Sequence, residues 1–268
     1  MIGRVQIEAA LAGHKRVVVA IVSEAKGSSP RDAETVMIVV DGGILGTIGG
    51  GTVEHQVIEQ AHQMLQEGGP PKNLDFPLGP DLDQCCGGHM RVQIGLAAPV
   101  GECIWPGGPQ FPEVAAKRSV IIYGAGHVGQ AILRALAPLP FRTMLVDARA
   151  DPPKNAAPDL ITPLPEAVAE EADPDAFHIV LTHSHAMDLE IVSAVLSKPF
   201  GFCGLIGSVT KRALFERRLV ERGFTRETIA ELTCPIGLPM LKDKRPEAIA
   251  ASVAVQLLLR DQVLRGQS

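Results

Sequence analysis

Short apolar runs that alternate with helical patterns dominate the second half of the chain. Val120–Tyr123 is a continuous apolar run of the kind found in a strand buried in a parallel sheet. A glycine-rich turn follows it, and Ile132, Leu133 and Leu136 then repeat at the spacing of a helix. Further strands are predicted at Phe141–Val146, Phe177–Leu181 and Phe202–Ile206. This alternation predicts a doubly wound α/β domain with a parallel sheet.

The turn after the first of these strands has the glycine spacing of a dinucleotide-binding fingerprint. Gly124 permits a tight turn, Gly126 allows a pyrophosphate to approach the backbone, and Gly129 allows the helix to pack closely on the strand. The helix that begins near His127 directs free N–H groups at such phosphates. Asp147 ends the next strand about 20 residues on, where a carboxylate would meet ribose hydroxyls. The pattern predicts a Rossmann-type domain.

The ligand of this turn stays open, because such glycines also occur where only the shape of the turn is required. Asp147 favours NAD over NADP, whereas Arg149, two residues on, could receive the 2′-phosphate of NADP. NAD(P) or another nucleotide is therefore a candidate ligand, with no preference between the two dinucleotides.

Polar side chains follow two later strands of the same sheet. His183 and His185 come after the third predicted strand, and strand ends of this kind face the ligand crevice of an open α/β sheet. The two histidines and a nearby aspartate suggest a metal, but their spacing departs from the metallo-β-lactamase pattern, so we favour a crevice-lining role. Ser208 is expected to cap the next helix and, like His127, to line the cofactor site. Lys211 and Arg212 either lie on a solvated face of that helix or reach an anionic ligand.

The first half of the chain predicts a smaller N-terminal α/β domain. Arg16–Val22 is too apolar to be half exposed, so this strand is expected near the centre of a sheet. The other expected elements are a helix within residues 1–12, a hairpin over 36–48, a helix from 49 to about 65 and strands over 74–78 and 91–96. A proline- and glycine-rich stretch predicts a linker at 98–117, between an N-terminal domain at 1–97 and the Rossmann-type domain at 118–268.

Two loops of the N-terminal domain carry groups that suit an anion. Arg31 lies in a polar loop and offers a bidentate donor fork. Gly49, Gly50 and Gly51 open a helix that contains Glu54, and backbone N–H groups in such a turn can cradle an anion. The alternative is a solvated turn for the Arg31 loop, and an ordinary glycine-rich connection between strand and helix for Gly49–Gly51.

Two adjacent cysteines, Cys85 and Cys86, precede a pair of glycines. In extended backbone their side chains point to opposite faces, so one would face the core and the other a cleft. They are either small buried hydrophobes or a thiolate that attacks, carries sulfur or binds a soft metal. They lack the two-residue spacer and the partner pair of a zinc site.

Composition excludes several other functions. The aromatic share is 4% and the net charge is −5 without a basic cluster, so we expect no nucleic-acid or membrane surface. We find neither a signal-peptide core nor an apolar run of membrane-spanning length. The five cysteines lack a framework spacing, which favours reduced thiols and a cytoplasmic location.

Seven motifs, in this order and spacing, resemble the xanthine dehydrogenase accessory proteins, the XdhC/CoxI family. They lie at residues 27–31, 46–51 with Glu54, 84–88, 124–129, 182–185, 204–208 and 235–238. The resemblance covers nearly the whole chain. One departure is Ala33–Glu34, where a glycine is expected in many relatives, so the loop that carries Arg31 is expected to turn differently here.

The resemblance implies a chaperone for the molybdenum cofactor rather than a stand-alone turnover enzyme. Such a protein binds molybdopterin, supports its sulfuration with sulfur from a cysteine desulfurase, and helps insert it into a xanthine dehydrogenase-like molybdoenzyme. Cys85 or Cys86 would then act on sulfur or molybdenum, with Cys86 the first candidate as a molybdenum ligand. Arg31 and the glycine-rich turns would hold the cofactor. The resemblance also implies a homodimer or larger assembly.

Two alternatives remain. An NAD(P)-dependent oxidoreductase would use the Gly124–Gly129 turn, with His183 or His185 as the proton donor. A purely structural assembly factor would bind no ligand. The motifs of the first half favour the chaperone, because a dehydrogenase does not explain them.

Overall fold

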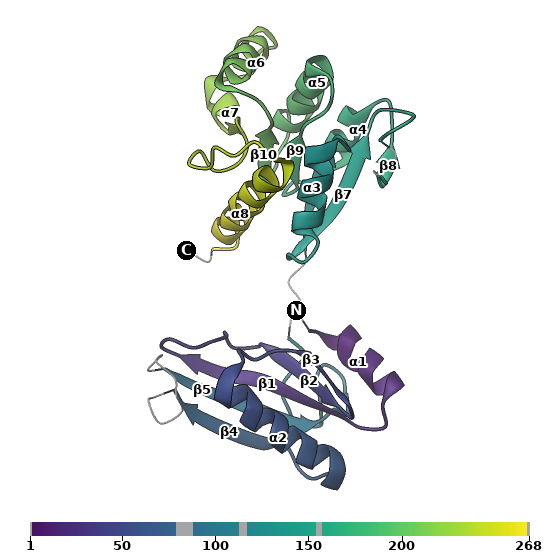
Figure 1. The fold of residues 1–268 in the computed structure, drawn as a ribbon, viewed down its shortest axis with the longest axis vertical. Helices are drawn as coiled ribbons and strands as arrows, with labels where there is room; N and C mark the ends of the chain where they lie inside the picture. Colours follow the sequence, from purple (N-terminus) through teal and green to yellow (C-terminus); the bar gives the residue numbers. More distant parts are fainter. Residues whose placement is uncertain (1, 79–87, 113–116, 154–156, 267–268) are drawn as a thin grey trace. The chain divides into compact units, whose positions relative to one another are not determined.

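A computed structural model describes residues 2–78, 88–112, 117–153 and 157–266 of the chain. The chain divides into two compact units, Met1–Ala115 and Ala116–Ser268 (Figure 1). In the described parts of the chain, every helix is too short or too polar to cross a membrane.

The first unit is a five-stranded antiparallel sheet in the order β3-β2-β1-β5-β4. The strands are β1 (Val17–Lys26), β2 (Val36–Val40), β3 (Gly43–Gly46), β4 (Lys72–Pro77) and β5 (His89–Leu96). The helices are α1 (Arg4–Gly13) and α2 (Gly51–Glu67). Strand β1 is central, as its apolar run predicts. Its residues are buried on both faces because alternate side chains pack into two separate cores, one under α2 and one beside α1.

The core beside α1 contains residues from the stretch expected to be a linker. Ile104 and Trp105 are buried there, and Phe111 packs against them. The Trp105 ring lies against Gly95, where an added Cβ would come within 2.9 Å of the ring. Apolar side chains within residues 98–112 of the predicted linker therefore help to fill the core beside α1 of the first unit.

The second unit is a six-stranded parallel sheet in the order β11-β10-β9-β6-β7-β8. The strands are β6 (Arg118–Tyr123), β7 (Phe141–Asp147), β8 (Leu160–Ile161), β9 (Phe177–Val180), β10 (Phe202–Leu205) and β11 (Leu232–Thr233). Counted along the chain from β6, this is the order 3-2-1-4-5-6 of a dinucleotide-binding Rossmann domain. The predicted fold class, a Rossmann-type domain with a smaller α/β domain before it, is confirmed.

Helices cover both faces of this sheet. They are α3 (His127–Leu136), α4 (Pro165–Glu171), α5 (His185–Leu196), α6 (Val209–Glu221), α7 (Arg226–Ala230) and α8 (Pro246–Leu264). Helices α3 and α8 pack on one face, and α4, α5 and α6 on the other (Figure 1). The strand order reverses between β6 and β9, and ligands of open α/β sheets bind beside such a reversal, at the carboxyl ends of the strands.

Hydroxyl side chains set where two of these helices begin. Ser208 caps α6 as expected, since its Oγ accepts from the N–H of Lys211 at 3.2 Å. Ser184 caps α5 in the same way, accepting from Met187 at 3.4 Å. Helix α5 therefore begins at His185.

Candidate functional site

The glycine turn after β6 is held against the end of β9. Gly124 has a φ of +122°, and an added Cβ would lie 2.4 Å from the carbonyl oxygen of Leu181. An added Cβ at Gly129 would lie 2.0 Å from the carbonyl oxygen of Gly124. At Gly126 an added Cβ would meet no atom within 4 Å. Packing therefore requires the first and third glycines, whereas the second borders the open space that a phosphate would need.

Asp147, the last residue of β7, is hydrogen-bonded to this turn. Its side chain is 2% exposed, and its Oδ2 accepts from the N–H of Ala125 at 2.7 Å. Its other partners are three N–H groups of Arg149: the backbone N at 2.9 Å, Nε at 2.8 Å and Nη2 at 2.7 Å. Burial alone would raise the pKa of Asp147, but the hydrogen bonds from Arg149 and Ala125 outweigh it and lower the pKa to about 2.

The end of β9 is tied to α6 by a buried ion pair. Asp188 is fully buried, and its Oδ1 accepts from the N–H and Oγ1 of Thr182, at 2.9 and 2.7 Å. Its Oδ2 accepts from Nζ of Lys211 at 2.7 Å, and that Nζ also donates to the carbonyl oxygen of Ile206. Lys211 was predicted either to lie on a solvated face or to reach a ligand; in the structure it forms an ion pair with Asp188 inside the protein. The spacing of apolar and polar residues does not indicate which charged side chains are buried together, so the sequence does not predict this pair.

The remaining expected crevice residues lie at the same edge of the sheet. His127 and His185 are the first residues of α3 and α5, and His183 lies between β9 and α5. All three imidazoles and the Ser208 side chain are exposed. In the described part of the chain, no group of three or more His, Cys, Asp or Glu residues has the arrangement of a metal site. The edge therefore presents exposed imidazoles and a hydroxyl beside three helix N-termini, those of α3, α5 and α6.

Three loops of the first unit meet at a second candidate site. An added Cβ at Gly49 would lie 2.4 Å from Cβ of Pro30 and 3.5 Å from Cγ of Arg31, so the two loops are in contact. An added Cβ at Gly88 would lie 2.3 Å from the carbonyl oxygen of Ser28. Arg31 is exposed at this junction, and an added Cβ at Gly50 would meet no atom within 4 Å. The junction therefore combines a guanidinium with an open glycine turn.

The glycine turn before α2 already holds an anion, the carboxylate of Glu54. Its Oε2 accepts from the N–H of Ile48 at 2.9 Å, from the N–H of Gly50 at 3.1 Å and from Oγ1 of Thr47. Burial would raise the pKa of Glu54, but these hydrogen bonds outweigh it and lower the pKa. The nest of N–H groups that the sequence predicts is thus filled by a side chain of the same helix, and Glu54 shapes the turn.

Glu34 has the left-handed conformation that glycine favours, with a φ of +67°. It is the one non-glycine residue with positive φ in the described ranges. Its N–H donates to the carbonyl oxygen of Val22 at 2.8 Å, which fixes the end of the Arg31 loop on β1. The glycine expected at Ala33–Glu34 therefore has a structural reason, and Glu34 adopts the glycine-like turn at a cost in strain.

Cys85 and Cys86 lie outside the described residues. Of the three described cysteines, Cys203 is fully buried, and burial raises the pKa of its thiol to about 12. Burial also raises the pKa of the Cys234 thiol. Raised pKa values keep these two thiols protonated, so neither has the character of a reactive thiolate.

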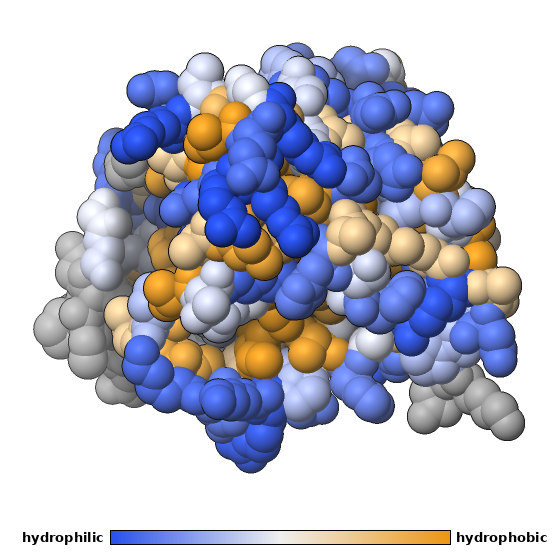
Figure 2. All heavy atoms as spheres, turned by 90° about the horizontal axis from the view of Figure 1, so that it is seen from above, coloured by the Kyte–Doolittle hydropathy of each residue, from blue (hydrophilic) through white to orange (hydrophobic). Residues whose placement is uncertain are grey.

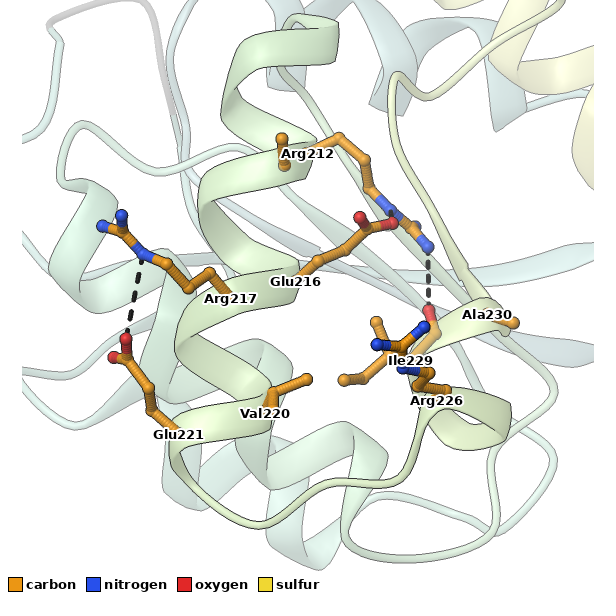
Figure 3. Close-up of a pocket in the computed structure, with 9 residues that line it drawn as sticks. Arg212, Glu216, Arg217, Val220, Glu221, Arg226, Ile229 and Ala230 are labelled. Carbon is orange, nitrogen blue, oxygen red and sulfur yellow. Dashed lines mark hydrogen bonds and ion pairs between the residues drawn. The ribbon is translucent and has the colours of Figure 1, made fainter.

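A groove of about 520 Å³ lies between α6 and α7 (Figure 3). Arg212 reaches across it to the carbonyl oxygens of Ile229, at 2.9 Å, and of Leu232. It also pairs with Glu216, so its charge is satisfied within the groove. We place no functional group in this groove.

On the face drawn in Figure 2, hydrophobic side chains (orange) reach the surface in small groups between hydrophilic ones (blue).

The fold and the crevice define a two-unit α/β protein with a C-terminal Rossmann domain. The second unit matches the XdhC Rossmann domain over residues 120–257, and the first matches the XdhC and CoxI family over residues 10–76. The chain belongs to the XdhC and CoxI family, and the resemblance seen in its motifs is confirmed.

A curated protein and a solved structure are similar to this chain. "Uncharacterized protein YqeB" of Escherichia coli (strain K12) is 31% identical over 252 residues, which cover 88% of this chain. The chain spans 42% of the length of that curated relative. A solved structure described as a xanthine dehydrogenase from Bacillus halodurans has a TM-score of 0.74 and 20% identity, covering 98% of this chain and 96% of that one. At this identity the likeness shows a shared fold.

Proposed function

We propose that this protein is an accessory protein for a xanthine dehydrogenase-like molybdoenzyme. It binds the molybdenum cofactor, supports its sulfuration together with a cysteine desulfurase, and assists its insertion into the client enzyme. The observation that carries the proposal is that the loop of Pro30 and Arg31, the turn at Gly49 and the backbone at Gly88 meet in the first unit, with Gly88 close to Ser28. Membership of the XdhC and CoxI family supports it.

The described residues of this junction fit the cofactor. The exposed guanidinium of Arg31 suits the phosphate of molybdopterin, and the open side of Gly50 admits a flat ring system. When bound, the cofactor supplies a thiophilic molybdenum centre, for which a thiolate is a suitable soft donor. We assign Cys86 as a candidate molybdenum ligand, and Cys85 or Cys86 as the thiol that serves sulfuration.

Retention of the cofactor tests this proposal. The protein is loaded with molybdopterin, passed through a desalting column and assayed by the fluorescence of the oxidised pterin. We expect the wild type to retain pterin, and Cys86→Ala and Arg31→Ala to retain less. Cys103→Ala is the matched control, because Cys103 lies in a different loop of the same unit. Absence of pterin in the loaded wild type would contradict the cofactor role.

Activation of a client enzyme tests the accessory role separately. Apo xanthine dehydrogenase is incubated with the cofactor and a cysteine desulfurase, with and without this protein. We expect faster activation when the protein is present and a loss of this effect in at least one of Cys85→Ala and Cys86→Ala. Unchanged activation in both variants would remove the thiol role. Sedimentation of the loaded protein would test the expected homodimer or larger assembly.

A second candidate function is nucleotide binding in the Rossmann crevice. The strand order 3-2-1-4-5-6 and the open space at Gly126 favour it. An NAD(P)-dependent hydride transfer would use this site, with exposed His183 or His185 as the proton donor. Calorimetry with NAD⁺ and NADP⁺ measures binding, and the loss of the near-ultraviolet absorbance of the reduced dinucleotides measures turnover. No binding of either dinucleotide at millimolar concentration would contradict this candidate.

A further inference from the structure

The end of β7 carries a guanidinium clamped onto a buried carboxylate. Nε and Nη2 of Arg149 donate to Oδ1 and Oδ2 of Asp147, at 2.8 and 2.7 Å, in a bidentate fork. The Asp147 side chain is 2% exposed, whereas that of Arg149 is 33% exposed. The buried carboxylate therefore fixes the direction of a partly exposed cation at the edge of the crevice.

Asp147 has no acceptor position left for a ribose. A carboxylate offers about four lone-pair positions. The N–H of Ala125 and the three N–H groups of Arg149 make four donors. A ribose diol could bind Asp147 only after displacing Arg149, which would break two charge-assisted hydrogen bonds.

Arg149 itself has donors to spare. A guanidinium has five N–H groups, and Asp147 takes one from Nε and one from Nη2. Among the described residues, no hydrogen bond occupies the other three. Two of them, the second N–H of Nη2 and one N–H of Nη1, form the neighbouring Nη1–Nη2 edge of the guanidinium, because the fork to Asp147 uses the Nε–Nη2 edge. That free edge matches the spacing of two phosphate oxygens.

We propose that Arg149 makes this crevice a site for a nucleotide with a 2′-phosphate on its ribose, in preference to a nucleotide whose 2′- and 3′-hydroxyls are free. The inference rests on the proposed nucleotide binding in the crevice and names the class of nucleotide. Asp147 is the positioning residue, since it orients Arg149 and holds the glycine turn through Ala125. Such an arrangement reverses the NAD preference that an aspartate at this position would otherwise indicate.

Calorimetry with two small probes tests this assignment on the full chain. Adenosine 2′,5′-bisphosphate and adenosine 5′-monophosphate differ only in the 2′-phosphate. We expect the wild type to bind the bisphosphate at least about tenfold more tightly, and Arg149→Ala to abolish that difference. Arg142→Ala is the matched control, because Arg142 lies at the opposite end of the same strand and pairs with Asp173. We expect it to leave both affinities unchanged.

Arg149→Lys separates the loss of the fork from a folding defect, because lysine keeps a positive charge beside Asp147 but cannot form the bidentate fork. We expect this variant to retain the fold by circular dichroism and to lose most of the preference. Equal or tighter binding of the monophosphate by the wild type, or no binding of the bisphosphate, would overturn the inference. So would an Arg149→Ala variant that keeps the preference.

Pterin retention and competition by inorganic phosphate distinguish a nucleotide site from a molybdopterin site or a simple anion site. We expect Arg149→Ala to retain molybdopterin like the wild type. If it loses pterin and still binds the bisphosphate, the phosphate belongs to molybdopterin and the nucleotide assignment fails. Inorganic phosphate that competes as well as the bisphosphate would also overturn it. A wild type that prefers the bisphosphate but retains no pterin would contradict only the accessory function.

Discussion

Replacement of Glu54 isolates the part that its carboxylate plays in the turn at residues 47–50. Three donors converge on Oε2, from Thr47, Ile48 and Gly50. A hydrogen bond to a charged group contributes about 1.5–3 kcal/mol, but water can reach these donors once the half-buried carboxylate is gone. We therefore expect Glu54→Ala to lower the free energy of unfolding of the first unit by about 2–3 kcal/mol.

Glu54→Gln separates the charge from the shape of the side chain. Its amide oxygen can still accept from the turn, so we expect a loss of about 1 kcal/mol at pH 7. Because the folded-state pKa of Glu54 is lowered, its contribution is complete above the ordinary value of 4.5 and is lost as the pH falls through the folded pKa. The difference between wild type and Glu54→Gln should therefore stay constant from pH 7 down to about 4.5 and shrink below that pH.

The fluorescence of Trp105 during urea unfolding measures the first unit alone. It is the sole tryptophan of the chain and is buried in the core beside α1. Glu59→Gln is the matched control on the same helix, because Glu59 is exposed and its replacement should change stability by less than about 0.5 kcal/mol. A Glu54→Ala variant as stable as Glu59→Gln would refute the role assigned to the carboxylate. Sulfate should partly restore Glu54→Ala, since it can occupy the vacated N–H nest.

Three further perturbations test other parts of the structure. Glu34→Gly should raise the stability of the first unit by about 1 kcal/mol in the same Trp105 assay, whereas Ala33→Gly should not raise it. Asp188→Ala should cost the second unit about 3–5 kcal/mol by circular dichroism, because it leaves the Lys211 ammonium buried and unpaired; adding Lys211→Met should recover part of this loss. Asp147 has a lowered pKa, so its contribution is complete above pH 3.8 and lost as the pH falls through about 2; Asp147→Asn should flatten the dependence of unfolding free energy on pH in that range.

Local sequence patterns were sufficient for the fold class and for most elements. The run Val17–Val22 predicts a strand buried on both faces, and the structure places it at the centre of the first sheet. The order of strand, glycine turn and helix around Gly124 predicts the Rossmann domain. These signals are local because side-chain periodicity and glycine conformations depend on the immediate backbone.

The candidate sites were located from sequence, but the partners of their charged groups were not. Asp147 was expected to meet a ribose and instead holds Arg149 and the turn. Lys211 was expected in solvent or on a ligand and instead pairs with Asp188. The glycine turn before α2 was expected to cradle an external anion and instead holds Glu54.

The amino-acid pattern thus determines which segments form strands, turns and helices, and which chemical groups stand at their ends. The pairing of those groups depended on the folded chain, because hydrogen bonds and ion pairs form between atoms within about 3–4 Å, whatever their separation in sequence. Trp105 illustrates the same limit for apolar groups: composition predicts a linker, yet its ring fits against Gly95 of the sheet. Contacts of this kind exist only once distant segments are brought together by the fold.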